Sequence, residues 1–255
     1  MLKKFLFLIL TIPGGQSLFA QIDSSSASVS SNSKRLKHYV HVGYNFGGLA
    51  PIPLPNTIRK IDSYSPGFSP SLSYEVVYPL SKTLGIGAAL RFDIKGMNIT
   101  DSVQYFHTLV TMDNSEFEGD FTGTNKTVDK NMYLSLPINV VYSARGNWRF
   151  KLGFYTAYLI RPSFSGQVSN GYIRKGNSLG EKVAIDTATF NFDDVQRKFD
   201  WGLQAGAEKR FLKRYAVTGD LQWGLRPVFP PSFKGIGYKM TNIFFTLGVR
   251  MQLFE

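Results

Sequence analysis

The chain contains few residues that could carry catalysis or hold a metal ion. It has no cysteine, and its histidines are His38, His41 and His107. None of the three has the spacing of a metal-binding pair, and the sequence places no serine or aspartate beside His41. A single histidine that points into the interior of a protein is usually a structural residue. We therefore expect no enzymatic activity, no cofactor and no metal ion. An enzyme with its site in the interior of the protein or in its loops is the alternative.

An acidic stretch is the second place where the residue types could do chemistry. Asp113, Glu116, Glu118 and Asp120 offer the carboxylate oxygens that Ca²⁺ prefers, but their spacing is not that of an EF-hand loop. We expect a solvated surface segment here rather than a calcium site.

Other charged residues alternate with apolar ones along extended segments. In residues 83–96 the even positions are apolar from Leu84 to Ile94, whereas the odd positions include Arg91 and Asp93. This period of two predicts a β-strand with one apolar face. Each such segment is long enough to cross a membrane as a tilted strand. The eight segments with this period are residues 38–49, 67–80, 83–96, 131–142, 148–161, 199–211, 215–226 and 241–254.

The N-terminus predicts export. Lys3 and Lys4 precede an apolar run at residues 5–12, and a small-residue stretch ends at Ala20. This order is that of a cleavable secretory signal, and the apolar run is too short to span a bilayer. The expected organisation is a signal peptide at residues 1–20, a Ser-rich flexible leader at residues 21–37 and one barrel domain at residues 38–255.

The net charge narrows the expected partners. The formal net charge is +11, and it becomes +9 when Lys3 and Lys4 leave with the signal, because residues 1–20 contain no acid. An exported protein rarely meets nucleic acid. We therefore assign the excess charge to contact with anionic head groups, and expect outer-membrane lipid as a partner and no nucleic acid.

The connections between the eight segments alternate in length. The short ones are residues 81–82, 143–147 and 212–214, and the longer ones are residues 50–66, 97–130, 162–198 and 227–240. Outer-membrane barrels have short periplasmic turns, longer external loops and both termini in the periplasm. The sequence therefore predicts an all-β protein, an eight-stranded antiparallel transmembrane up-and-down β-barrel in a Gram-negative outer membrane.

The polar face of such a barrel lines a lumen that its own side chains fill. Buried charges must be paired, because an unpaired charge costs several kcal/mol. We expect a structural ion-pair network there, with a small channel as the alternative. Its predicted members are Glu75, Arg91, Asp93, Lys151, Asp200, Glu208, Arg210, Asp220 and Arg250, and Lys95 and Arg226 share their parity.

Aromatic residues on the apolar parity gather at both ends of the predicted strands. Beside the short turns lie Tyr78, Tyr142, Trp148, Phe211 and Tyr215, and at the opposite ends lie Phe46, Phe68, Phe92, Tyr158, Trp201 and Trp223. Two such rings are typical of the aromatic girdles at the two membrane interfaces. A soluble β-sandwich or lipocalin-like barrel, the alternative fold, gives no reason for aromatics at both ends.

Two strands resemble a known family. Residues 133–142 begin Tyr-Leu-Ser-Leu-Pro and, with residues 150–154, resemble the "YLxIP" strand and its partner in PorT-like outer-membrane barrels of the Bacteroidota. Residues 198–207 look like the family's "fDxGlxxGxG" strand. The resemblance implies an eight-stranded outer-membrane barrel, and some relatives serve a secretion and gliding-motility system. The acidic stretch at residues 112–120 is not part of the shared pattern, so the secretion role remains one option.

Two short motifs and two Pro-rich loops bear on the external face. Asp101-Ser102-Val103 and Asp186-Thr187-Ala188 match the Asp-Ser/Thr-apolar signal that Bacteroidota use for O-glycosylation. Prolines at positions 51, 53, 55, 230 and 231 stiffen two loops, which favours presented surfaces over a mobile lid. We therefore expect a structural or interaction barrel that binds a protein or glycan through the loops at 50–66, 97–130, 162–198 and 227–240.

Overall fold

The computed structural model describes residues 35–112 and 115–253. The predicted signal peptide, residues 21–34 of the predicted leader, and Asp113 of the acidic stretch lie outside this range. The barrel strands begin at Lys37, the last residue assigned to the leader from sequence.

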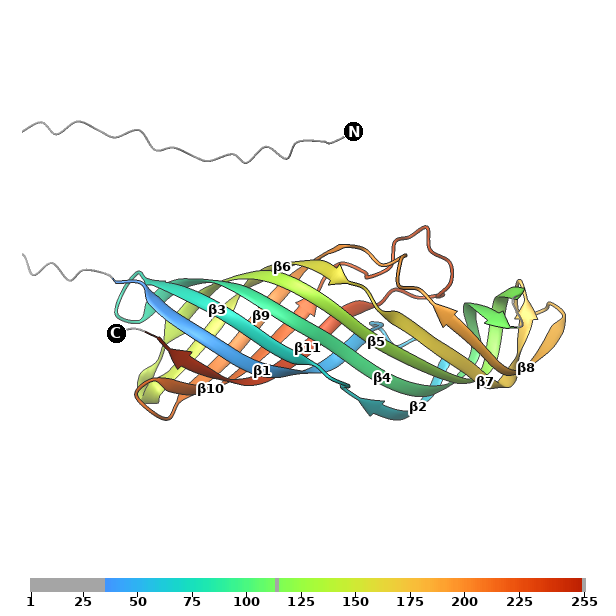
Figure 1. The fold of residues 1–255 in the computed structure, drawn as a ribbon, viewed down its shortest axis with the longest axis horizontal. Helices are drawn as coiled ribbons and strands as arrows, with labels where there is room; N and C mark the ends of the chain where they lie inside the picture. The colour runs from blue at the N-terminus through green and yellow to red at the C-terminus, as the bar shows by residue number, and fades with distance from the viewer. Residues whose placement is uncertain (1–34, 113–114, 254–255) are drawn as a thin grey trace, which may run out of the picture. The chain divides into compact units, whose positions relative to one another are not determined.

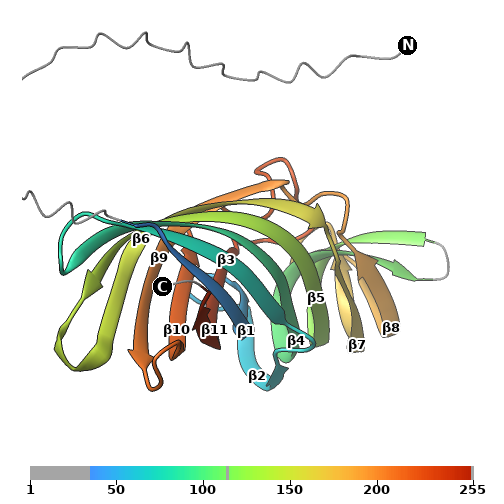
Figure 2. The ribbon, with the colours of Figure 1, turned by 60° about the vertical axis from the view of Figure 1, so that its left-hand side comes forward.

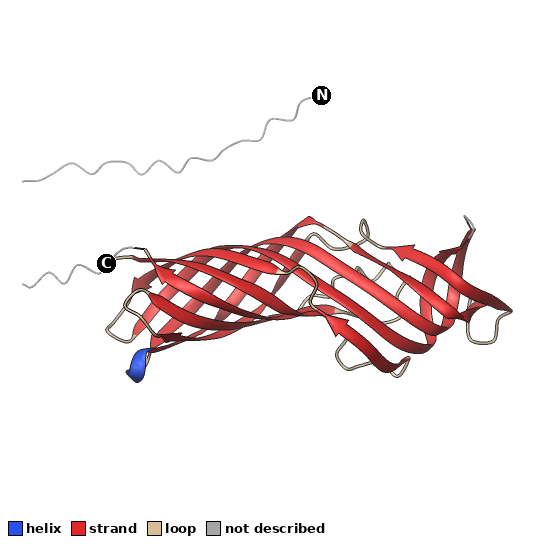
Figure 3. Ribbon diagram, turned by 60° about the horizontal axis from the view of Figure 1, so that its bottom comes forward, coloured by secondary structure: helices blue, strands red, loops and turns tan. Residues whose placement is uncertain are grey.

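The described chain consists mostly of antiparallel strands (Figure 3). A short 3-10 helix, η1 at Arg145–Asn147, lies in one of the turns. The strands are β1 Lys37–Ala50, β2 Ile58–Ser65, β3 Pro70–Pro79, β4 Leu84–Met112, β5 Ser115–Ser143, β6 Trp148–Arg161, β7 Phe164–Lys175, β8 Lys182–Asn191, β9 Phe199–Arg210, β10 Tyr215–Gly224 and β11 Thr241–Gln252.

Hydrogen-bonded pairs close eight of these strands into a ring. The ring runs β1–β3–β4–β5–β6–β9–β10–β11 and returns to β1, where Tyr39 pairs with Gln252 and Ala50 with Thr241. Figure 1 shows the tilted strands of this ring. Closure leaves the ring without a free edge, as a strand structure in lipid requires. Among the described residues, no helix is long and apolar enough to span a bilayer.

The predicted total of eight strands is wrong, because the sheet has eleven. In the described part of the chain, each of the eight predicted segments overlaps one strand of the ring, and the additional strands β2, β7 and β8 lie in segments predicted as loops. The predicted loop at 97–130 is also mostly strand, because β4 and β5 continue through it as one long hairpin. A β-bulge between Val103 and Phe106, with Tyr105 at φ 54°, shifts the alternation there, which hides the strand from a period-two reading.

The outer halves of β4 and β5 build an external region with its own core. β2 pairs with residues 98–103 of β4, and β7 and β8 extend the sheet from β5 (Figure 2). A single bridge between Thr111 and Thr189 joins β8 back to β4. The buried apolar residues of this external core are Leu49, Met97, Val103, Phe106, Val110, Phe121, Phe164, Val168, Ile173, Ile185, Ala188, Phe190, Phe192, Val228, Phe229, Ile236 and Met240.

Candidate functional site

Glu208 is the centre of the charge network inside the ring. Its carboxylate accepts hydrogen bonds from Arg149 Nε at 2.7 Å and Arg149 Nη2 at 2.9 Å. Lys151 Nζ lies 3.0 Å and Arg250 Nε 2.9 Å from the same carboxylate. All four side chains are buried, so one carboxylate is shared by three cations in a site with little access to water.

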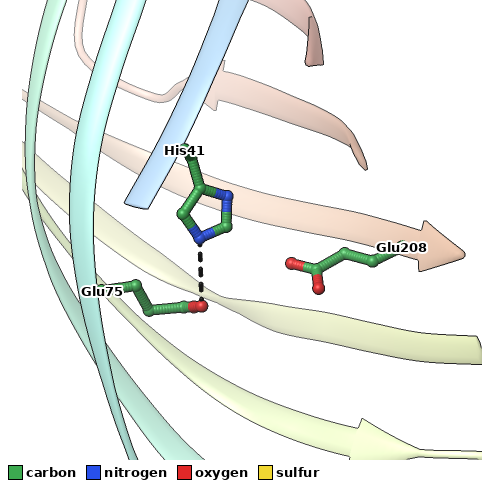
Figure 4. A group of neighbouring side chains, drawn as sticks. All are labelled: His41, Glu75 and Glu208. Atoms are coloured by element: carbon green, nitrogen blue, oxygen red, sulfur yellow. Dashed lines mark hydrogen bonds and ion pairs between the residues drawn. The ribbon is translucent and has the colours of Figure 1, made fainter. Parts of the chain in front are cut away.

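Glu75 gives the network its second carboxylate. Arg149 Nη2 lies 2.6 Å from Glu75 Oε2, and His41 Nε2 lies 3.2 Å from the same oxygen. Figure 4 shows His41, Glu75 and Glu208 converging from β1, β3 and β9. Their potential ligand atoms lie within 4.8 Å of one another. Both carboxylates already bind cationic side chains, so a metal ion would have to displace Arg149 to bind here.

The network extends along the lumen through two further contacts. Asp220 Oδ1 lies 2.9 Å from Lys151 Nζ. The Tyr39 ring is close to both Arg149 and Arg250, with guanidinium carbons 4.5 and 4.2 Å from its centroid, a cation–π arrangement that offsets the crowding of positive charge.

A second cluster lies nearer the external end. Arg91 Nε bonds Asp93 at 2.9 Å, and Arg91 Nη2 donates to Asn45 Oδ1 at 3.1 Å and to Thr246 Oγ1 at 2.5 Å. The lumen network thus combines ion pairs with neutral polar partners, which satisfy the donors left over by the carboxylates.

An aromatic layer closes the external end of the lumen. Tyr133, Tyr155 and Phe244 are fully buried, and their ring centroids lie 5.1–5.3 Å from Lys95 Nζ. Lys95 Nζ has no hydrogen-bond partner among the described residues, and its contacts with these rings are of the cation–π kind. Asp200 lies in the same layer and accepts from Tyr155 at 3.0 Å.

The structure places most, but not all, of the predicted network residues in the lumen. Glu75, Arg91, Asp93, Lys151, Glu208, Asp220 and Arg250 are buried and paired. Two predictions need correction. Arg210 is exposed and bonds Asn147 Oδ1 at 2.6 Å, because β9 reaches the turn there. Asp200 is buried but held by hydrogen bonds from Tyr155 and Asn242 rather than by an ion pair.

The prediction also omitted Arg149, which joins Glu75 to Glu208. Arg149 lies two residues before Lys151 in β6 and therefore points to the same side of the strand. This shared parity predicts an inward side chain. Arg226, on the predicted inward parity, is half-buried and donates to the Phe199 carbonyl.

The space left inside the network is small. A cavity of about 20 Å³ lies among His41, Glu75, Arg91, Lys151 and Asp220. That is room for about one water molecule, so side chains fill the lumen at this level.

A much larger cavity lies where the ring meets the external region. Its volume is about 250 Å³. Its walls come from the end of β1, from β2, from the outer halves of β4 and β5, and from residues 236–240. The lining is mostly apolar and includes Met97, Phe106 and Phe192, together with the buried polar residues Asp101, Thr108, Asn125 and Thr127. We call this cavity the junction pocket.

Comparison with known proteins identifies the chain's family. The family model described as "Outer membrane protein beta-barrel domain" matches residues 19–230. The chain belongs to this family.

Solved structures of outer-membrane barrels also match at low identity. Ail, the attachment invasion locus protein of Yersinia pestis, is 10% identical, with a TM-score of 0.36 over 85% of this chain and 98% of that chain. A triple mutant of the Rhodopseudomonas blastica porin is 12% identical, with a TM-score of 0.17 over 86% of this chain and 99% of that chain. The transport unit of the Escherichia coli autotransporter AIDA-I is 8% identical, with a TM-score of 0.18 over 89% of this chain and 93% of that chain. No curated protein matches this chain.

As an outer-membrane barrel, the protein meets lipid with its outward apolar face. All the residues predicted to form the two girdles are exposed, as that position requires: Tyr78, Tyr142, Trp148, Phe211, Tyr215, Phe46, Phe68, Phe92, Tyr158, Trp201 and Trp223. Between them the exposed wall carries Leu72, Ile86, Leu90, Val140, Leu152 and Phe154.

The remaining sequence motifs lie in external strands rather than in loops. Ser102 is in β4, and its hydroxyl donates to Asp62 Oδ2 at 2.7 Å; Thr187 is in β8 and exposed. Glu118 and Asp120 of the acidic stretch flank His107, at 3.4 and 2.9 Å from its ring nitrogens. A histidine between these carboxylates gives them a partner other than a calcium ion.

Proposed function

We propose that this outer-membrane barrel is a non-conducting, non-catalytic anchor that presents its external region to a protein or glycan partner. The observation that carries the proposal is the contrast between the filled lumen and the separately packed external region. The lumen is closed by the Glu208 network and the aromatic layer around Lys95, which supports an anchor over the alternative of a small channel.

The external region has the properties of a presented binding surface. Its apolar core buries three phenylalanines, Phe164, Phe190 and Phe192, in mutual ring contact at 5.1–6.1 Å. Such a core holds the outer strands in place, so the exposed side chains keep a fixed arrangement that a partner can recognise. At the β7–β8 hairpin, Leu179 is 93% exposed, an apolar side chain with no cover.

The PorT-like resemblance of residues 133–142 and 198–207 supports a narrower proposal. We propose that the partner belongs to a secretion or surface complex of the outer membrane. In that role the barrel supplies an anchor, and the external region supplies the contact.

Cross-linking and capture from intact outer membranes tests the proposal. A defined partner should co-purify with the wild-type chain and be reduced severalfold by Leu179→Asp at the external hairpin. The matched change Leu212→Asp, in the short turn before β10, should leave capture unchanged. Purified protein in planar bilayers should show no porin-sized conductance. Equal capture by both variants, or such a conductance, would overturn the proposal.

A further inference from the structure

The junction pocket has an open side that adjoins the outer aromatic girdle. Leu54, Ile61 and Tyr64 line the pocket and are exposed at its mouth. The Tyr64 hydroxyl accepts from the Gly47 amide at 2.7 Å and donates to the Gly47 carbonyl at 2.8 Å. Gly47 follows directly on the girdle residue Phe46, so the mouth opens next to the lipid interface.

The size of the pocket sets the size of what it can hold. A dry apolar cavity of about 150 Å³ accommodates benzene, a molecule of six carbons. By the same packing, the 250 Å³ of the junction pocket accommodates an alkyl segment of about ten carbons. Ordinary ligand pockets begin at about 300 Å³, so this one suits a single chain rather than a bulky ring system.

The polar atoms in the pocket define the chemistry of the head group. Thr108 is 1% exposed and Asn125 4% exposed, and neither Thr108 Oγ1 nor Asn125 Oδ1 has a hydrogen-bond partner among the described residues. The Asp101 carboxylate accepts one bond from Asn125 Nδ2 at 2.9 Å. Two of these groups accept hydrogen bonds and the hydroxyl of Thr108 both donates and accepts, so a ligand hydroxyl satisfies them.

The charge of Asp101 sets a further requirement. Among the described residues, no cationic side chain lines the pocket, so an anionic head group would meet the Asp101 carboxylate without a counter-charge. A neutral head group avoids this repulsion.

We propose that the junction pocket binds a neutral single-chain amphiphile, with an alkyl chain of about ten carbons and a hydroxyl head group, that enters from the outer leaflet. The chain would lie against Met97, Phe106 and Phe192, and the head-group hydroxyl would bond Thr108, Asn125 or Asp101. This site is separate from the filled lumen and does not depend on the proposed partner.

Photolabelling of the full-length protein in nanodiscs tests this site. The probe is 1-decanol with a diazirine in its chain, and labelled peptides are mapped by mass spectrometry. We expect labels in β2 and in residues 97–108 of β4, removed by excess decanol and not by decanoate at neutral pH. A phospholipid with a diazirine in its chain should label the girdle residues instead. Pocket labelling by this lipid as strong as that by decanol would overturn the proposal, because the occupant would then be an ordinary bilayer chain.

Four variants separate binding from folding. Ala50→Phe fills the pocket and should abolish labelling, whereas Ala207→Phe adds the same ring on the outer wall of β9 and should not. Thr108→Val keeps the side-chain volume and should lower labelling about fivefold, the effect of one hydrogen bond. Asp101→Asn should allow decanoate to compete. Unchanged labelling in Ala50→Phe, or an equal loss in Ala207→Phe, would refute the site.

Discussion

The two halves of β4 follow opposite rules on the same strand. Between residues 84 and 96 the inward face carries the buried Arg91, Asp93 and Lys95, and the outward face is apolar and is exposed from Leu84 to Phe92. From Met97 onward the inward face becomes mostly apolar, with Met97, Val103, Phe106 and Val110 buried in the external core beside the polar Asp101 and Thr108. The outward side chains there are polar or partly exposed.

The medium around the wall explains this reversal. Where hydrocarbon surrounds the barrel, apolar side chains lose nothing by facing out, and the polar ones must find partners inside. Where water surrounds the chain, burial of apolar surface is favourable, so the apolar side chains turn inward. Alternation of apolar and polar residues therefore indicates a strand. Whether the inward residues are polar or apolar indicates whether lipid or water surrounds that strand.

The largest expected effect tests the membrane half of this comparison. Glu208→Gln keeps the side-chain shape but removes the charge shared by Arg149, Lys151 and Arg250. Breaking a buried pair costs about 3–5 kcal/mol, because it leaves an uncompensated charge. We expect a loss of barrel stability of this size, measured by urea unfolding followed by gel mobility of the folded and unfolded forms.

The control for Glu208→Gln is a matched change in an exposed ion pair. Glu181 lies 3.1 Å from Lys175 at the external surface, and both side chains are exposed. Glu181→Gln should cost less than about 1 kcal/mol. Equal losses in the two variants would show that the lumen charges do not depend on their pairing.

A smaller loss of stability is expected when a buried isoleucine of the external core is truncated. An isoleucine on the lipid-facing wall provides the comparison. Ile185 in β8 is 1% exposed, whereas Ile160 in β6 is 50% exposed on the outer face. Ile185→Ala opens a cavity and should cost about 3–4 kcal/mol, and Ile160→Ala leaves no enclosed cavity and should cost about 1 kcal/mol. Hydrogen exchange should show the loss in β7 and β8, while the ring amides keep their protection. Loss of protection throughout the ring would mean that the two regions unfold as one unit.

Much of the ring could be predicted from sequence, because a lipid-facing strand keeps strict alternation over a length set by the bilayer. Residues 83–96 and 148–154 show this period without interruption, and both lie in ring strands. The inward position of Glu75, Glu208 and Arg250 follows from the same parity.

The external region could not be predicted in this way. The bulge at Tyr105 reverses the parity of β4, and β2 is exposed on nearly every residue, so neither shows a continuous alternation. The junction pocket depends on contacts between segments far apart in the sequence, such as Leu49, Phe106, Phe192 and Met240. Which lumen carboxylate meets which cation is likewise set by strand register and tilt, and these are not visible in a single sequence.

The last and smallest expected effect concerns the boundary between the two halves. Burial, against the hydrogen bond from Asn125 and with a smaller contribution from the nearby Asp62 carboxylate, raises the pKa of the Asp101 carboxyl from its usual 3.8 to about 6. The folded external region therefore holds a proton that the unfolded chain has released. Between about pH 4 and pH 6 the folded state binds more protons, so its stability should fall as pH rises through this interval and stay at the lower level above it.

Asp101→Asn should remove this pH dependence and leave the external region about 2–3 kcal/mol more stable at neutral pH than the wild type. Hydrogen exchange of β2 and the outer half of β4, measured at pH 4 and pH 7, gives the comparison after correction for intrinsic exchange rates. Asp186→Asn, at an exposed position of β8, is the matched control and should leave the pH dependence of the wild type in place. If the wild-type external region instead became more stable from pH 4 to pH 7, folding would not raise the pKa of Asp101. The boundary would then be better hydrated than its apolar lining indicates.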